Sequence, residues 1–361
     1  MLADAVPLYP LYALLFADTG LSAADISALF ALWSFMGVVA EVPSGALADR
    51  FGRRAAVVAA GILQAAGYLT WIALPGFPGF AAGFVLWGLG AAMASGAFEA
   101  LLYDGLAAAG EADRYARVLG RVEAAGLAVQ VPIAGAATAL FAAGGYTLAG
   151  VVSVATSLGA AAVAATLPDV RPGAVRAGEA GELGYLATLR AGVDEAAGSP
   201  PVRAAVLGVA AITAFDGLEE YFPLLAAEWG VPTEVIPTAL VAIPLAGALG
   251  AALGGRAALL GPVGITLMLL AAVGSLAAAG LVAHPAGIVG VTIFYGLYRL
   301  AVVIADTRLQ ERIDGPARAT DVTVLALLAA VTVPGRLGRT RAGGARPDPA
   351  ATTAPSRSGS G

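Results

Sequence analysis

The 361-residue sequence contains no cysteine, no lysine and a single histidine, His284. Without cysteine the chain can form no disulfide, no thiolate nucleophile and no cysteine-ligated metal site. One imidazole next to Pro285, in an expected turn, is typical of a loop residue, and no cluster of histidines and carboxylates points to a metal or another cofactor. A Gly-x-x-x-x-Gly-Lys-Ser/Thr phosphate loop is also absent, which argues against ATP-driven chemistry within this chain.

Charged side chains are scarce, at 12% of the residues, whereas a soluble domain carries about 25%. Hydrophobic residues make up 59%, and the mean hydropathy is +0.82. This composition predicts an all-α polytopic membrane protein rather than an enzyme, and the 48 glycines suit helices that pack closely in lipid. All 20 basic residues are arginines, most of them loop anchors without the interleaved aromatics of a nucleic-acid surface, so we expect no nucleic-acid partner.

Several apolar stretches approach the roughly 20 residues that a helix needs to cross a bilayer. We expect membrane helices at residues 5–17, 26–42, 55–74 and 79–106, a fifth that ends at Gly144 and Gly145, and a sixth that ends at residue 167. Four more are expected at residues 202–225, 235–253, 257–282 and 286–305. Up to Arg318, every arginine falls in a cytoplasmic loop or loop edge of this scheme, except Arg299. This asymmetry follows the positive-inside rule and predicts a multi-pass protein of the inner (cytoplasmic) membrane.

The loop between the second and third expected helices reads GALADRFGRR over residues 45–54, which we interpret as a tight, charged hairpin. The stretch resembles the signature loop of the major facilitator superfamily (MFS), Gly-x-x-x-Asp-Arg/Lys-x-Gly-Arg/Lys-Arg/Lys, at every fixed position. The matching residues are Gly45, Asp49, Arg50, Gly52, Arg53 and Arg54. The alternative is an ordinary arginine-rich loop in which the glycines occur by chance. The resemblance implies two six-helix halves, alternating access, and a gating role for this loop.

The MFS resemblance suggests an N-terminal half at residues 1–168, a cytoplasmic linker at 169–201 and a C-terminal half at 202–333. Short sequence matches between the halves recur at an offset of about 209 residues, as parallel repeats do. On that period we expect an eleventh helix reduced to a stub at 322–333, no twelfth helix, and a disordered basic tail at 334–361. A truncated or frame-shifted gene end would explain this; the alternative is a genuine basic tail.

In MFS proteins helices 1, 4, 7 and 10 line the central cavity, and several polar residues fall on their counterparts here. The candidate proton or substrate residues are Glu99, Asp216, Glu219 and Arg299, and the candidate cavity aromatics are Tyr12, Tyr103 and Tyr295. The spacing of Asp216, Glu219 and Glu220 predicts that all three share one helix face. We hypothesise that Asp216, Glu219 or Glu99 takes up and releases a proton, with Arg299 as counterion or as ligand of an anionic group. The alternatives are a structural ion pair and acids near the lipid headgroups.

The resemblance further suggests that Asp104 and two other acids, Glu41 and Glu123, form gate salt bridges with Arg114, Arg117 or Arg121. The alternative is that these acids are surface charges that snorkel toward water. We expect a monomeric secondary transporter that moves a small-molecule substrate by alternating access, coupled to protons, with multidrug or metabolite export favoured. The alternatives are a solute importer and a truncated, non-transporting membrane protein.

Overall fold

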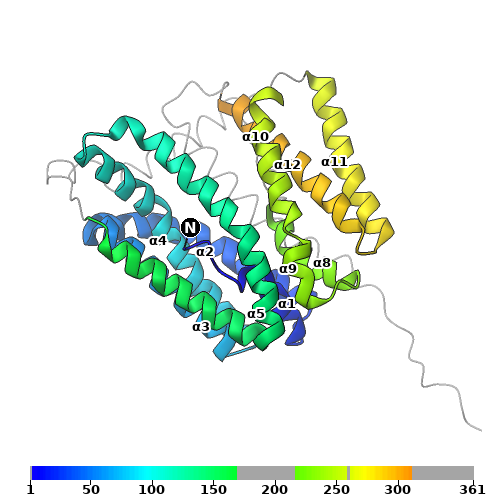
Figure 1. Cartoon of the computed structure of the whole chain (residues 1–361), viewed down its shortest axis with the longest axis horizontal. Coiled ribbons are helices and arrows are strands. Elements are labelled where there is room, and N and C mark those ends of the chain that lie inside the picture. The colour runs from blue at the N-terminus through cyan, green and yellow to red at the C-terminus, as the bar shows by residue number, and fades with distance from the viewer. Residues whose placement is uncertain (1, 169–215, 258–260, 311–361) are drawn as a thin grey trace, which may run out of the picture.

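The computed structural model describes residues 2–168, 216–257 and 261–310 (Figure 1). Within these ranges the chain is helical and contains no strand, as the sequence predicts. The expected linker, the stub at 322–333, the missing twelfth helix and the tail lie outside the described residues, as does the first part of the expected helix 202–225.

The first half of the chain forms long helices joined by short turns. Its elements are η1 (Tyr9–Leu11), α1 (Tyr12–Asp18), α2 (Ala23–Phe51), α3 (Arg53–Ala73), α4 (Phe77–Ala108), η2 (Ala112–Arg114) and α5 (Tyr115–Thr166). The long α5 breaks at Gly144 and Gly145, whose backbone angles are not helical and where Gly145 has φ +61°. It is therefore two consecutive helices, which turn where the sequence predicts a turn.

The second half of the described chain is shorter and more interrupted. Its elements are η3 (Asp216–Tyr221), α8 (Phe222–Glu228), η4 (Thr233–Val235), α9 (Ile236–Ala239), α10 (Ala242–Ala257), α11 (Pro262–Val282) and α12 (Gly287–Gln310). The expected helix 235–253 is thus broken between α9 and α10, and the expected helix 202–225 ends as a 3₁₀ segment followed by α8.

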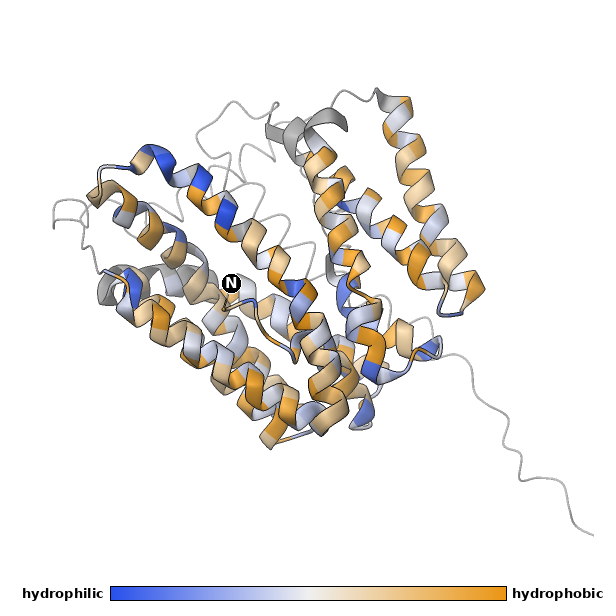
Figure 2. Ribbon diagram, viewed as in Figure 1, coloured by the Kyte–Doolittle hydropathy of each residue, from blue (hydrophilic) through white to orange (hydrophobic). Residues whose placement is uncertain are grey.

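Six helical stretches in the described residues are long and apolar enough to cross a membrane. They are Arg53–Ala73, Phe77–Ala108, Arg117–Thr166, Thr233–Gly254, Val263–Val282 and Gly287–Ala305. Hydrophobic residues occur along the whole length of these helices, and hydrophilic ones gather near the start of α5 and at turns (Figure 2). On α11, Val263 and Leu281 are 73% and 87% exposed, as suits side chains that face lipid.

The MFS-like segment at residues 45–54 differs from the expected hairpin loop. Helix α2 continues to Phe51, and α3 starts at Arg53, so only Gly52 separates the two helices. Gly52 has φ +97°, a conformation that glycine adopts without the steric cost of a Cβ atom. The expected turn between the two helices is confirmed at Gly52. The residues before Gly52 are helical, because α2 extends about two turns further than predicted.

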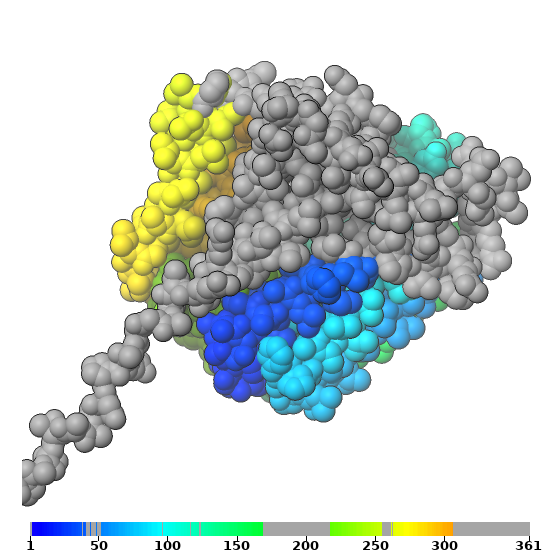
Figure 3. Space-filling view, turned by 180° about the vertical axis from the view of Figure 1, so that it is seen from behind, coloured from blue at the N-terminus to red at the C-terminus, as the bar shows by residue number. Residues whose placement is uncertain are grey.

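The two halves meet at the end of the molecule where α1 and α8 finish. There α1 packs against α8, and α5 packs against η4 and α9, while α10 and the start of α5 diverge at the other end (Figure 1). On the reverse face the surface of α1 and α2 adjoins that of α4, and α11 stands apart from both (Figure 3). The contacts between the described parts of the two halves therefore concentrate at one end of the bundle.

Close helix packing depends on glycine. A Cβ atom on Gly250 of α10 would lie 2.0 Å from the Gly296 carbonyl oxygen of α12, so the two backbones touch there. On α11, Gly274 is exposed, and a Cβ atom on it would have no neighbour within 4 Å. Small residues allow such approaches between helices in lipid.

We predict that Gly250→Ala destabilises the protein by about 1–3 kcal/mol, because the added methyl group forces α10 and α12 apart. Gly274→Ala is the matched control, and it should leave stability unchanged or raise it slightly, since alanine favours helix. Thermal unfolding of the detergent-purified variants measures both. Equal melting temperatures for the two variants would contradict the packing argument.

Candidate functional site

The segment η3 places two adjacent carboxylates between the halves. Glu220 is only 6% exposed, and its carboxylate accepts hydrogen bonds from the hydroxyl groups of Tyr12 and, at 3.4 Å, Tyr9. Both tyrosines belong to the start of the chain, so the bonds cross from one half to the other. Glu220 thus extends from the second half into the core of the first.

The neighbouring carboxylate points into its own half. Glu219 accepts a hydrogen bond from the hydroxyl group of Tyr295 on α12. Arg299 lies one helical turn after Tyr295 on the same face, and both side chains pack over Gly247 of α10, where a Cβ atom would lie 2.5 Å from the Tyr295 ring and 3.1 Å from Arg299 Cγ. The absence of a side chain at Gly247 therefore allows Tyr295 to reach Glu219.

The 3₁₀ geometry explains how consecutive residues reach different halves. A 3₁₀ helix turns about 120° per residue, so neighbouring side chains diverge widely. The prediction that Asp216, Glu219 and Glu220 share one face is therefore wrong for Glu219 and Glu220, which bond to different halves. Asp216 begins η3, and its side chain lies outside the described part of the structure.

Aromatic side chains surround Glu220. The space between them is a cavity of about 10 Å³, which has room for about one water molecule. The lining residues are Tyr9, Tyr12, Trp33, Tyr68, Trp71, Phe84, Trp87 and Glu220. Within this wall Tyr12 stacks on Trp71 with ring centroids 5.3 Å apart, and Trp33 lies 5.5 Å from Trp87. The cavity is smaller than the roughly 300–1,000 Å³ of common ligand sites.

Much of the hydrogen-bonding capacity of this wall is used internally. Trp87 Nε1 donates to the Tyr68 hydroxyl at 2.8 Å, and Trp71 Nε1 donates to the Phe80 carbonyl at 3.1 Å. Tyr9 and Tyr12 donate to Glu220. These bonds fix the orientation of the rings and leave the cavity with an aromatic surface and one carboxylate.

The residue after Glu220 adds a further contact between the halves. The Tyr221 hydroxyl donates to Ser27 Oγ on α2 at 2.8 Å, and its ring meets Phe30 edge-on at 5.2 Å. Three consecutive residues of η3 therefore bond to different elements. Glu219 bonds to α12, Glu220 to η1 and α1, and Tyr221 to α2.

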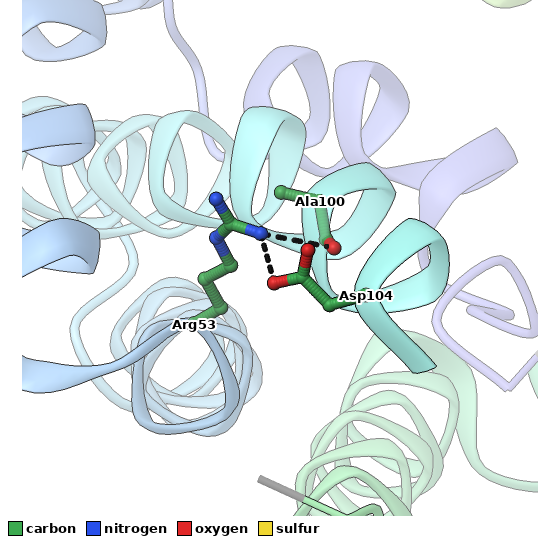
Figure 4. A network of polar contacts seen from close by, with 3 residues as sticks. All are labelled: Arg53, Ala100 and Asp104. Atoms are coloured by element: carbon green, nitrogen blue, oxygen red, sulfur yellow. Dashed lines mark hydrogen bonds and ion pairs between the residues drawn. The ribbon is translucent and has the colours of Figure 1, made fainter. Parts of the chain in front are cut away.

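At the far end of the bundle, the signature segment makes a different set of contacts. Arg53 forms an ion pair with Asp104 of α4 and donates to the Ala100 carbonyl at 3.2 Å (Figure 4). Arg54 donates to the Leu167 carbonyl at 3.3 Å. These bonds tie the α2–α3 turn to the ends of α4 and α5. The surroundings of Gly45 and the side chains of Asp49 and Arg50 are outside the described structure, so the expected gating role of the segment stays a prediction.

The expected partners of Asp104 are corrected here. We expected Arg114, Arg117 or Arg121, but Asp104 pairs with Arg53, because Arg53 begins α3 beside the last turns of α4. Arg114 instead pairs with Glu111 at 2.7 Å, within its own connection. The side chains of Glu41 and Glu123 are not described.

Glu99 and Tyr103 do not join the group around η3. Glu99 is exposed and lies 3.5 Å from the Tyr115 hydroxyl, and Tyr103, 48% exposed, packs against the Tyr115 ring. Glu99 lies twelve residues beyond Trp87 on α4, which is about 18 Å along a helix. The structure thus brings together Tyr12, Glu219, Tyr295 and Arg299 near η3, and leaves Glu99 and Tyr103 near the other end of α4.

Sequence reasoning did not single out Glu220 or the three tryptophans of the cavity wall. Glu220 was visible as one of several acids, and its adjacency to Glu219 was the available signal. Trp33, Trp71 and Trp87 belong to three different helices, so their convergence follows from the fold and not from spacing along the chain.

Comparisons with known proteins support the fold. The chain resembles the crystal structures of a D-xylose-proton symporter (TM-score 0.67, 14% identity, covering 92% of this chain and 86% of that one) and of the nucleoside transporter NupG (0.71, 12%, 91% and 85%). It also resembles a bacterial homolog to the human lysosomal transporter Spinster, in an inward-facing and occupied conformation (0.68, 16%, 91% and 76%). No curated protein sequence matches. The sequence model of the Major Facilitator Superfamily matches residues 1–331, and the chain therefore belongs to this superfamily.

Proposed function

We propose that the protein is a proton-coupled secondary transporter that exports a small solute by alternating access, with Glu220 as the coupling carboxylate and Glu219 as its partner in the second half. The observation that supports this most directly is the position of Glu220, buried between the halves and bonded to Tyr9 and Tyr12 of the opposite half. This assignment replaces Glu99 in the proton hypothesis and keeps Glu219. Arg299 and Asp216 remain candidates for substrate contact.

The chemistry of the pair explains how a proton could drive the cycle. An ionised carboxylate accepts stronger hydrogen bonds than a neutral one, so ionised Glu220 holds Tyr9 and Tyr12 and keeps the halves together at the α1–α8 end. A protonated or ligand-neutralised Glu220 binds the phenols less strongly and costs less to carry through a low-dielectric core. Occupation of Glu220 therefore shifts the balance between the two conformations.

We predict that Glu220→Gln abolishes proton-driven flux, with a loss of about 100-fold or more, because the amide cannot exchange a proton. The variant should still exchange labelled for unlabelled solute across liposomes without a pH gradient. The solute comes from a flux screen on the wild-type protein. Exposed Glu234, in the turn before α9, provides the control Glu234→Gln, which should transport normally. Wild-type proton-driven flux in Glu220→Gln would rule out this role for Glu220.

We predict that Tyr12→Phe opens the α1–α8 end more often, since Glu220 loses a donor from the opposite half. The native chain has no cysteine, so a single Leu224→Cys on α8, packed against the core of the first half, reports on this end without background. A membrane-impermeant maleimide should label it several-fold faster in the Tyr12→Phe background than in the Tyr103→Phe control. Unchanged labelling rates would argue against the tyrosine–carboxylate contact as a closing element.

We predict that Arg53 and Asp104 couple energetically as a pair. Both side chains are partly buried, so a double-mutant cycle with Arg53→Gln and Asp104→Asn should give about 0.5–1 kcal/mol in unfolding free energy. Each single variant should also change the solute transport rate if the pair gates the cytoplasmic end. Additive effects of the two substitutions on both measurements would contradict a functional ion pair.

A further inference from the structure

We infer that Ser153, on the part of α5 that follows the turn at Gly145, is a positioning residue that holds η1 where Tyr9 and Tyr12 reach Glu220. Ser153 neither lines the cavity beside Glu220 nor bonds to the carboxylate itself, so it acts through the tyrosines. The inference rests on the proposed function, in which the tyrosine–carboxylate contact closes the α1–α8 end.

A buried hydrogen bond links Ser153 to the start of the chain. Ser153 Oγ accepts from the backbone N–H of Leu8 at 2.9 Å, and both residues are 0% exposed. The Ser153 hydroxyl donates its own proton to the Ala149 carbonyl, 2.7 Å away and one turn earlier on α5. Because that proton is already used, the oxygen meets Leu8 as an acceptor, and the bond has one defined direction.

The start of η1 needs this acceptor. Leu8 is the N-cap residue of η1, and no side chain of the segment caps the helix. The next donors, Tyr9 and Leu11, bond within the segment, and Pro10 has no N–H. Leu8 is closed to water, so without Ser153 its N–H would be buried and unsatisfied, which costs free energy. The bond therefore fixes the position of η1 against α5.

A second bond from the same face of α5 attaches the other end of α1. Tyr146, two turns before Ser153, donates to the Asp18 carboxylate at 2.5 Å. Asp18 is the last residue of α1. The segment that carries Tyr9 and Tyr12 is thus bonded to α5 both before and after the two tyrosines, and α5 determines where their hydroxyl groups lie.

Ser157 provides a matched comparison on the same helix. It follows Ser153 by one turn and is 2% exposed, but its Oγ has no hydrogen-bond partner within the described part of the chain. Two buried serines of α5 therefore differ in whether they bond to η1. Replacing each by alanine separates the loss of the Leu8 bond from the general effect of removing a buried hydroxyl group.

Maleimide labelling of Leu224→Cys on α8, in the full-length protein in liposomes, tests the inference because it reports how often the α1–α8 end opens. In this background Ser153→Ala should label about three- to tenfold faster, as the loss of one hydrogen bond predicts. Ser157→Ala should label at the unchanged rate. Ser153→Thr keeps the hydroxyl group and should restore the original rate, and melting temperatures establish that the variants are folded.

A combined variant distinguishes positioning from a general loss of stability. When Tyr9→Phe and Tyr12→Phe are both present, the bonds that Ser153 positions are already gone. Adding Ser153→Ala should then raise the labelling rate by less than about twofold, because coupled residues are not additive. Multiplication of the two separate effects would overturn the inference, since Ser153 would then act independently of the tyrosines.

Equal rates for Ser153→Ala and Ser157→Ala, or fast labelling of Ser153→Thr, would also overturn it. If Ser153→Ala does not fold, Ser153→Cys replaces it, because a thiol accepts hydrogen bonds only weakly, and its background is measured without the Leu224→Cys reporter. An unchanged rate in that variant would equally overturn the inference.

Because no flux is measured, failure here is distinct from failure of the proposed transport. Fast labelling of Ser153→Ala together with full proton-driven flux in Glu220→Gln would retain the role of Ser153 and reject the proton role of Glu220. Unchanged labelling of Ser153→Ala together with Glu220-dependent flux would do the reverse.

Discussion

A carboxylate inside a membrane bundle needs a partner for its charge, because hydrocarbon offers no water to solvate it. In this protein one short 3₁₀ segment carries two adjacent groups of this kind, and tyrosines of different halves donate to them. Tyr295 of the second half donates to Glu219, and Tyr12 of the first half donates to Glu220. The cost of leaving either group unbonded holds η3 in place between the halves. The position of α8, and with it the closed α1–α8 end, depends on this arrangement.

The packing around η3 explains why the donors are available there. Tyr12 is held between Trp71, on which it stacks, and the edges of Phe30 and Phe84, so its hydroxyl has one direction in which to point. On the other side, Gly247 leaves room for the Tyr295 ring. A rigid aromatic core in the first half and a glycine contact in the second thus present preformed donors to the two carboxylates, which limits the entropy lost when the halves meet.

Most of the fold follows from the sequence because membrane helices are marked by length, hydropathy and arginine placement. The turns at Gly52 and at Gly144 and Gly145 were predictable, since glycine tolerates backbone angles that other residues avoid. The site was only partly predictable. Tyr12, Glu219 and Tyr295 emerged from the expected cavity helices, whereas the contacts of Glu220 depend on how the two halves place Tyr9 and Tyr12 beside it, which spacing along the chain does not reveal. The partner of Asp104 depends on where α2 ends, and the hydrophobic pattern does not fix that boundary.

Adjacent carboxylates also connect the halves electrostatically. Two like charges on consecutive residues repel each other, so neutralising Glu220 makes the charge on Glu219 less costly and strengthens its bond to Tyr295. In the proposed mechanism, a proton that binds Glu220 therefore changes the interaction of η3 with α12 in the second half. No long pathway is needed, because the signal crosses a single peptide unit. Such a short connection lets occupation of one half alter how firmly the segment is anchored in the other, as alternating access requires.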